Sequence, residues 1–236
     1  MNFNILVDYD NVYDHDRRLG LPHVISKITA VISPHLPVAV NRLSYRLYGG
    51  WFEEAKLSRS AQKLGASITT YPTAANINGN AGVVQVDFAR ALFSNPRNHL
   101  THTFRPRGQV PRLSCEASPY RRCTVTAQCP LIHLAAFINS EQCHSSGCPV
   151  TPADILKKEE QKLVDTMIVS DIAYLATQDV TSAIAVVSAD YDIWPGIVNA
   201  LAFGKGVVHV HPKPNYGIRR NRYAVPIGSS YVPLSF

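Results

Sequence analysis

The chain has 236 residues, which suffice for one sizeable hydrophobic core but would make two full domains cramped. Hydrophobic residues make up 46% of the chain and charged residues 17%, the balance of an ordinary globular protein. No apolar run reaches the roughly 18 residues that a membrane span needs. The first residues lack the basic and long apolar regions of a secretory signal. We therefore expect no membrane partner and a cytoplasmic protein with reduced thiols. The formal net charge of +6 favours polyanionic partners without naming one.

The first part of the chain predicts alternating strands and helices. The apolar run 3–7 predicts a buried parallel strand that ends in a polar cluster. Apolar residues at helical spacing predict a helix over 23–32, and two prolines end it. Beyond these elements we expect a strand over 38–48, a helix over 52–64, a strand over 66–71 and a helix over 83–93.

Residues 95 to about 152 interrupt this alternation with many Pro, Arg, Ser and His residues and little periodicity. Regular elements return afterwards: a helix over 155–176, a strand over 183–188, a helix over 194–203, a strand over 206–210 and a short strand near Tyr231. Strands that alternate with helices predict βαβ units and a mostly parallel sheet with helices on both faces. The sequence thus predicts one α/β domain over 1–236 with an irregular insertion that contains the cysteines.

Acidic residues follow two of the expected strands. Residues 3–7 lead into Asp8, and residues 183–188 lead into Asp190 and Asp192. Ligands of open α/β sheets bind at the carboxyl ends of strands, where these clusters meet if the strands are neighbours. Converging carboxylates repel one another unless a cation neutralises them, and oxygen ligands suit Mg²⁺ or Mn²⁺. A single aspartate in this position is more often a helix cap or turn residue, but two clusters favour a metal site.

Three segments resemble the signature motifs of NYN domains, which are relatives of the PIN nucleases. They are residues 5–11 (ILVDYDN), residues 161–166 (QKLVDT) and residues 187–195 (VSADYDIWP). Residues 48–51 (YGGW) are also similar to a feature of some members. The resemblance covers about residues 3–94 and 155–211 and leaves the middle segment outside. It implies a PIN-like three-layer α/β/α sandwich that hydrolyses phosphodiester bonds with a divalent metal ion.

Site residues are carried over from this resemblance by position. It implies that Asp8, Asp165 and Asp190 bind the metal ion and that Asp192 is a fourth acid, acting directly or through water. Asn11 and Ser188 would orient these ligands or the scissile phosphate.

Two residues depart from the family pattern, and three acidic residues outside it have more ordinary interpretations. Leu163 and Ala189 stand where glycine is usual, and Ala189 could constrain its turn because glycine tolerates backbone angles that alanine does not. Neither change removes a carboxylate. We expect Asp10 to be a turn residue, Asp171 to cap the helix or pair with an arginine, and Asp87 to lie on a helix surface or in a salt bridge.

The cysteines all fall within the insertion, and several readings of them remain open. Four thiolates, or three and a histidine, would make a tetrahedral structural zinc site that supplies folding energy. No Cys-x-x-Cys pair occurs, so a disulfide and free thiols are alternatives. The candidate ligands are Cys115, Cys123, Cys129, Cys143, Cys148 and His144.

Histidines and basic residues offer weaker signals. His209 and His211 alternate on an expected strand and so share one face, where two ordinary strand residues are a commoner finding than a metal site. Basic residues of the insertion and of the tail, with two tyrosines between them, fit either a path for a nucleic-acid backbone or a solvated surface. They are Arg97, Arg105, Arg107, Arg112, Arg121, Arg122, Lys213, Arg219, Arg220 and Arg222, with Tyr216 and Tyr223.

The leading functional hypothesis is a metal-dependent endoribonuclease. A catalytically weak RNA-binding or other nucleic-acid-binding module is the alternative from a different class. A phosphatase or sugar-nucleotide enzyme on the same scaffold is disfavoured because the chain has no Gly-rich phosphate loop. The sequence leaves single-stranded DNA as a substrate open, and a homodimer is compatible with it.

Overall fold

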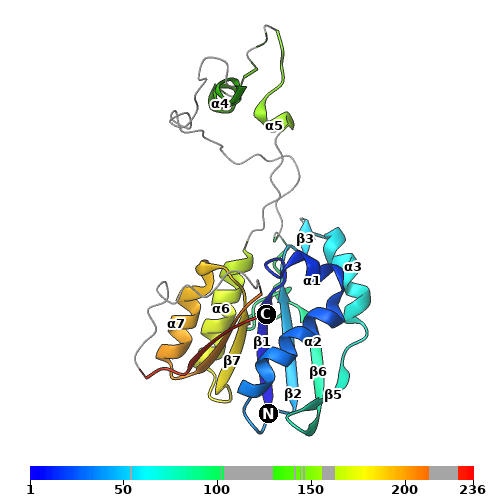
Figure 1. Cartoon of the computed structure of the whole chain (residues 1–236), viewed down its shortest axis with the longest axis vertical. Coiled ribbons are helices and arrows are strands. Elements are labelled where there is room, and N and C mark those ends of the chain that lie inside the picture. Colours follow the sequence, from blue (N-terminus) through cyan, green and yellow to red (C-terminus); the bar gives the residue numbers. More distant parts are fainter. Residues whose placement is uncertain are drawn as a thin grey trace. The chain divides into compact units, whose positions relative to one another are not determined.

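A computed structural model describes most of the chain (Figure 1). The described residues are 1–53, 55–101, 103, 130–140, 142–143, 145, 147–155, 163–212 and 228–236. The chain divides into two compact units, Met1–Phe104 with Gln161–Phe236 and, separately, Arg105–Glu160. The first unit contains the sheet and all the aspartates of the expected metal site.

Seven strands of the first unit form one sheet in the order β5-β6-β2-β1-β7-β8-β9. All neighbouring strands pair in parallel except β5 and β6, which are antiparallel. The strands are β1 (Asn2–Asp8), β2 (Arg42–Tyr48), β5 (Thr73–Ile77), β6 (Asn80–Phe88), β7 (Ala183–Val187), β8 (Gly206–His211) and β9 (Tyr231–Ser235). Two shorter strands, β3 (Phe52–Glu53) and β4 (Lys56–Leu57), pair separately. The α/β class with a mostly parallel sheet is confirmed.

Helices cover both faces of this sheet, as Figure 1 shows. The apolar residues of α2 and α3 join one buried cluster with Phe3, Ile5 and Val7 of β1. Those of α6 and α7 join a second cluster with Leu6. Because β1 is buried on both sides, Ile5, Leu6 and Val7 are apolar in succession instead of alternating with polar residues. The helices of this unit are α1 (Asp14–Arg18), α2 (Leu21–Ile32), α3 (Arg59–Ile68), α6 (Val164–Thr177) and α7 (Trp194–Ala202), with the 3-10 turns η1 (Ser33–His35) and η4 (Tyr191–Ile193).

In the second unit the structure describes α4 (Pro130–Ser140) and α5 (Pro152–Ile155). The helix α4 lies inside the segment that was expected to be irregular. None of the helices in the described ranges has both the length and the apolar character that a bilayer crossing requires.

The sequence interpretation is wrong between residues 52 and 93. The expected helix 52–64 is the β3–β4 hairpin followed by α3, and α3 begins only after Ser58, whose Oγ accepts a hydrogen bond from the Ala61 backbone N–H at 3.2 Å. The expected strand 66–71 is the end of this helix, which stops at Ile68, and the turn that follows it. The expected helix 83–93 is largely β6, so Asp87 lies on a strand, where Gln85 Nε2 donates to it at 3.0 Å.

A tight hairpin turn decides that this region forms strands and not the expected helix. The turn between β5 and β6 contains Asn78 with φ 51° and Gly79 with φ 83°. Asparagine followed by glycine is the preferred pair for a tight hairpin because both positions need positive φ. Since the turn forces β5 and β6 together, the apolar residues of 83–88 follow strand spacing, with Val84 and Val86 buried.

Candidate functional site

Asp8 lies at the carboxyl end of β1 and is only 3% exposed. β1 pairs with β7 on one side, where Val7 is opposite Val187, so Ser188 emerges beside Asp8. Ser188 Oγ donates to Asp8 Oδ2 at 2.9 Å, and the Asn11 backbone N–H donates to Asp8 Oδ1 at 3.3 Å. Both oxygens of the buried carboxylate are therefore held by the two loops that leave the sheet here.

The loop after β7 folds around Ser188 and Asp190. The Asp190 backbone N–H donates to Ser188 Oγ at 3.0 Å, and the Asp192 backbone N–H donates to Asp190 Oδ1 at 3.0 Å. The second contact caps the 3-10 turn η4 that follows. The Ser188 hydroxyl thus accepts a hydrogen bond from the Asp190 backbone N–H and donates one to Asp8. It joins the two acidic clusters directly.

Three carboxylates converge beside this pair. Asp165 in the first turn of α6, Asp190 and Asp192 each offer an oxygen, and the three oxygens lie within 4.8 Å of one another. Among the described residues, this is the group of His, Cys, Asp and Glu side chains that could hold a metal ion. Asp8 lies outside this group of three, although its pKa responds to the charge of Asp165. The expected ligands therefore form a triad with Asp8 as a buried neighbour.

Burial and like charges act on the protonation of the cluster. Burial, followed by the charges of Asp165 and Asp10, raises the pKa of Asp8 to about 7, despite the hydrogen bonds from Ser188 and Asn11. Burial and the charges of Asp190 and Asp192 raise the pKa of Asp165. A divalent cation would relieve this repulsion.

The available donors fit such a cation. All the side chains of the triad provide oxygen, as hard cations require. Asn11 Oδ1 is a buried oxygen without a hydrogen-bond partner among the described residues, close in sequence to Asp8. A buried acceptor of this kind needs an explanation, and a cation or its water would satisfy it.

Asp10 has structural contacts that agree with the expected turn role. The Gly50 backbone N–H donates to Asp10 Oδ2 at 2.8 Å, and Arg17 Nη1 lies 3.6 Å from Asp10 Oδ1. At Gly49 an added Cβ would lie 2.7 Å from Asp10 Oδ2, so only glycine allows this approach. The Gly49-Gly50 pair therefore serves to anchor the loop that follows Asp8.

The two departures from the glycine pattern have different consequences. Leu163, which precedes α6, has φ 66° and is therefore in the left-handed region that glycine favours. Ala189 is not among the described residues with positive φ. The expected constraint at Ala189 is thus absent, and the backbone strain lies at Leu163, two residues before Asp165.

A buried ion pair fixes α6 against the sheet. Asp171 Oδ2 accepts from Tyr48 Oη at 2.6 Å and lies 3.0 Å from Arg46 Nε, while Asp171 Oδ1 accepts from the Phe93 backbone N–H at 2.7 Å. Burial raises the pKa of Asp171, although these three partners favour its charged form. The expected pairing of Asp171 with an arginine is confirmed, and Tyr48 directly neighbours Asp8 in the sheet.

His209 and His211 share one face of β8, as their spacing predicted, with ring centroids 4.4 Å apart. Both side chains are buried. His209 Nε2 lies 3.0 Å from the Ser188 carbonyl oxygen, a contact with the site that sequence reasoning missed. Burial, followed by the proximity of His211, lowers the pKa of His209 to about 3. The adjacency of β7 and β8 was the one signal that could have indicated this contact.

The predictions for the insertion stay predictions. Of the proposed zinc ligands, Cys143 and Cys148 are described and have free thiols, while Cys115, Cys123, Cys129 and His144 lie outside the described residues. A hydrogen bond from the Ser145 backbone and one with Cys148 lower the pKa of Cys143. Arg97 is the described member of the basic set. The remaining basic residues, with Tyr216 and Tyr223, also fall outside the described ranges.

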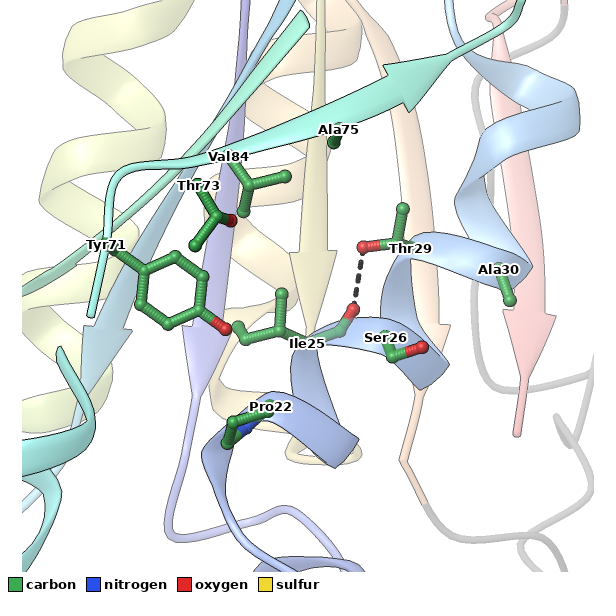
Figure 2. A pocket seen from close by; sticks show the side chains of 9 residues that line it. All are labelled: Pro22, Ile25, Ser26, Thr29, Ala30, Tyr71, Thr73, Ala75 and Val84. Atoms are coloured by element: carbon green, nitrogen blue, oxygen red, sulfur yellow. Dashed lines mark hydrogen bonds between the residues drawn. The ribbon is translucent and has the colours of Figure 1, made fainter.

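An open cavity of about 370 Å³ lies elsewhere, between α2 and β5 (Figure 2). Its lining includes Ile25, Thr29 and Tyr71, and Thr29 Oγ1 donates to the Ile25 carbonyl at 2.7 Å beside it. None of the acidic site residues lines this cavity. The acidic site is therefore separate from this cavity.

No protein-family model matches the chain, and no curated protein or solved structure is significantly similar to it.

Proposed function

We propose that this chain is a divalent-metal-dependent endonuclease that hydrolyses RNA. The observation that carries the proposal is the convergence of Asp165, Asp190 and Asp192 within 4.8 Å of one another, beside a buried Asp8. Three carboxylates gathered from two segments of the chain repel one another, and a bound cation would offset this repulsion. Exposed acidic groups without a cation are common, and the buried Asp8 and the unsatisfied Asn11 Oδ1 give the proposal further support.

The residues have distinct tasks in this proposal. Asp165, Asp190 and Asp192 would hold Mg²⁺ or Mn²⁺, and the neighbouring Asp8 would add to the negative charge of the site when it is deprotonated. Such an ion, when bound, makes water a nucleophile at neutral pH and stabilises the charge that develops on a phosphodiester. Ser188 and the Asn11 backbone N–H hold Asp8 in place, and Asn11 Oδ1 offers an acceptor that can orient a ligand.

RNA is proposed as the substrate on two grounds. The three acidic segments resemble the motifs of NYN domains, whose PIN-like arrangement of helices and sheet is compatible with the order of elements found here. The formal net charge of +6 favours a polyanion. A cytoplasmic location belongs to the same proposal.

The decisive experiment is cleavage of a labelled single-stranded RNA with Mn²⁺ or Mg²⁺, with EDTA added to stop it. Asp165→Asn and Asp190→Asn should each lower the cleavage rate by about 100-fold or more, because each removes a ligand charge. Asp179→Asn, an exposed aspartate after α6, is the matched control and should cleave like the wild type.

RNA binding in EDTA, measured with the same proteins, separates the alternatives. Both site variants should bind RNA about as well as the wild type. A wild type that binds RNA but cleaves with neither ion would favour the catalytically weak binding module. Unchanged cleavage in both site variants would show that the assigned residues are not the site.

A further inference from the structure

Tyr231 of the last strand, β9, contacts the loop 188–194, which contains Asp190 and Asp192. Tyr231, the first residue of β9, has its hydroxyl 2.8 Å from His209 Nδ1. Its ring also packs edge-on against Trp194, with centroids 5.6 Å apart and planes at 81°. Trp194 directly follows the 3-10 turn that contains Asp192. Tyr231 therefore supports the loop 188–194 at its far end.

The same tyrosine reaches the near end of the loop through His209. The Ser188 carbonyl oxygen, 3.0 Å from His209 Nε2, can only accept, so Nε2 carries the hydrogen. In the neutral ring Nδ1 is then an acceptor, and the Tyr231 hydroxyl must donate to it. The directions of both hydrogen bonds are thus fixed, which also fixes the orientation of the imidazole.

Ser188 passes this arrangement to the acidic residues. Its carbonyl accepts from His209, its hydroxyl donates to Asp8, and the same hydroxyl oxygen accepts from the Asp190 backbone N–H. Ser188 and His209 are both fully buried, so these bonds form without competition from water. The chain from Tyr231 to Asp8 is continuous, with contacts of 2.8 to 3.0 Å.

We propose that His209 and Tyr231 are positioning residues that set the cation affinity of the acidic site by fixing the loop 188–194. The inference rests on the proposed function, because it assumes that Asp190 and Asp192 bind a divalent cation. It adds that the C-terminal strand is part of the site's supporting structure. Supporting groups around ligands typically change metal affinity by about 10–100-fold when they are removed.

A purely structural role would give a different result. If the network only stabilised β8 and β9, its loss would lower the stability of the fold and leave cation affinity unchanged. The measurement that separates the two is Mn²⁺ binding to the whole chain, monitored through the electron paramagnetic resonance signal of free Mn²⁺.

Three variants test the network. His209→Leu removes both hydrogen bonds and should weaken Mn²⁺ binding by about 10–100-fold. His209→Gln has a donor for Ser188 and an acceptor for Tyr231, so we expect it to restore binding to within about threefold of the wild type. Tyr231→Phe keeps the ring against Trp194 but loses the donor to Nδ1, and should weaken binding by about three- to tenfold.

Tyr45→Phe is the matched control. It also loses a buried tyrosine hydroxyl, which lies 2.6 Å from Thr29 Oγ1 in the cluster under α2 and α3. We expect it to lose stability but to bind Mn²⁺ like the wild type. Tyr231→Phe is the mildest change, so it tests the proposal even if His209→Leu does not fold.

The outcomes are distinguishable. Wild-type affinity in folded His209→Leu or in Tyr231→Phe would overturn this inference and leave the proposed function intact. Equal losses in Tyr231→Phe and Tyr45→Phe would also overturn it, because the effect would then be general. A wild type that binds no Mn²⁺ would overturn the proposed function and this inference together.

Discussion

Ser188 and Asp8 are 180 positions apart in the chain, yet Ser188 Oγ donates a hydrogen bond of 2.9 Å to Asp8 Oδ2. The contact closes the boundary between β1 and β7 at the edge where the aspartates gather. Ser188 is an uncharged partner, and burial has the largest influence on the pKa of Asp8. The stability of the fold should consequently depend on pH through Asp8, and a comparison of the wild type with Asp8→Asn tests this.

We predict that Asp8→Asn removes a pH-dependent loss of stability when no metal is present. The folded-state pKa of Asp8 is about 7 against an ordinary 3.8, so the native state binds the proton more tightly than the unfolded state. The resulting stabilisation is complete below about 3.8 and is lost as the pH rises through about 7. The loss amounts to at most about 4 kcal/mol.

Urea unfolding in EDTA at several pH values between 4 and 8 measures this effect. Wild type and Asp8→Asn should differ little at pH 4, and the variant should be the more stable protein at pH 8. The difference between the two proteins reports the titration of Asp8 together with its charge coupling to Asp165, and it removes the contribution of groups that titrate alike in both. Parallel pH profiles would contradict the assigned environment of Asp8.

We predict that Mn²⁺ stabilises the wild type against heat. At a concentration of about 100 times Kd, binding to the native state alone adds about 2.7 kcal/mol. For a chain of this length that corresponds to a rise in Tm of about 5–10 °C. The rise should be larger at pH 8 than at pH 6, because a deprotonated Asp8 and Asp165 leave more negative charge for the cation to neutralise.

Differential scanning fluorimetry with and without Mn²⁺ checks this expectation. Asp165→Asn and Asp190→Asn should lose most of the rise, whereas Asp179→Asn should keep it. A rise of the same size in all four proteins would place the cation elsewhere on the molecule.

We predict that Arg46→Met destabilises the fold by about 3–5 kcal/mol, because it leaves the fully buried Asp171 without its cation. Arg46 also lies over the Phe93 ring, 4.0 Å from its centroid, and donates to the Ala91 carbonyl. The double variant with Asp171→Leu should recover part of the loss, since the unpaired buried charge is then gone.

Urea unfolding of the two single variants and the double variant forms a double-mutant cycle for this pair. Additive losses would mean that Arg46 and Asp171 do not depend on one another. Unfolding of Tyr48→Phe measures what the tyrosine hydroxyl contributes to the stability of this buried group, because the variant loses the hydrogen bond of 2.6 Å to Asp171.

We predict that the folded protein is more stable with glycine than with alanine at position 163. The backbone of Leu163 has φ 66°, which costs a residue with a Cβ about 1–2 kcal/mol. Leu163→Gly should therefore be more stable than Leu163→Ala by about 1 kcal/mol, because both remove the half-exposed side chain and only glycine removes the strain. Chemical unfolding of the two variants measures the difference. An alanine variant as stable as the glycine variant would show that the position carries no strain.

Local patterns in the sequence determined the fold class. The apolar runs of β1, β7 and β8 and the spacing of α2 and α7 are strong enough to identify these elements, because burial on both faces or on one stripe leaves a clear periodicity. Over 52–93 the apolar spacing fits both short strands and a helix, and the Asn78-Gly79 turn is the feature that decides for strands in β5 and β6. The order of the strands then places Asp8 and Ser188 side by side.

The aspartates of the site can be identified from the sequence, because they directly follow expected strands or lie in an expected helix. Their grouping was decided only by tertiary structure. The packing of α6 through Asp171 sets the position of Asp165, which converges with Asp190 and Asp192. Asp8 lies outside this group of three and is bound by Ser188. The roles of His209 and Tyr231 also depend on strand order, since hydrogen bonds between distant segments leave no periodic trace in the chain.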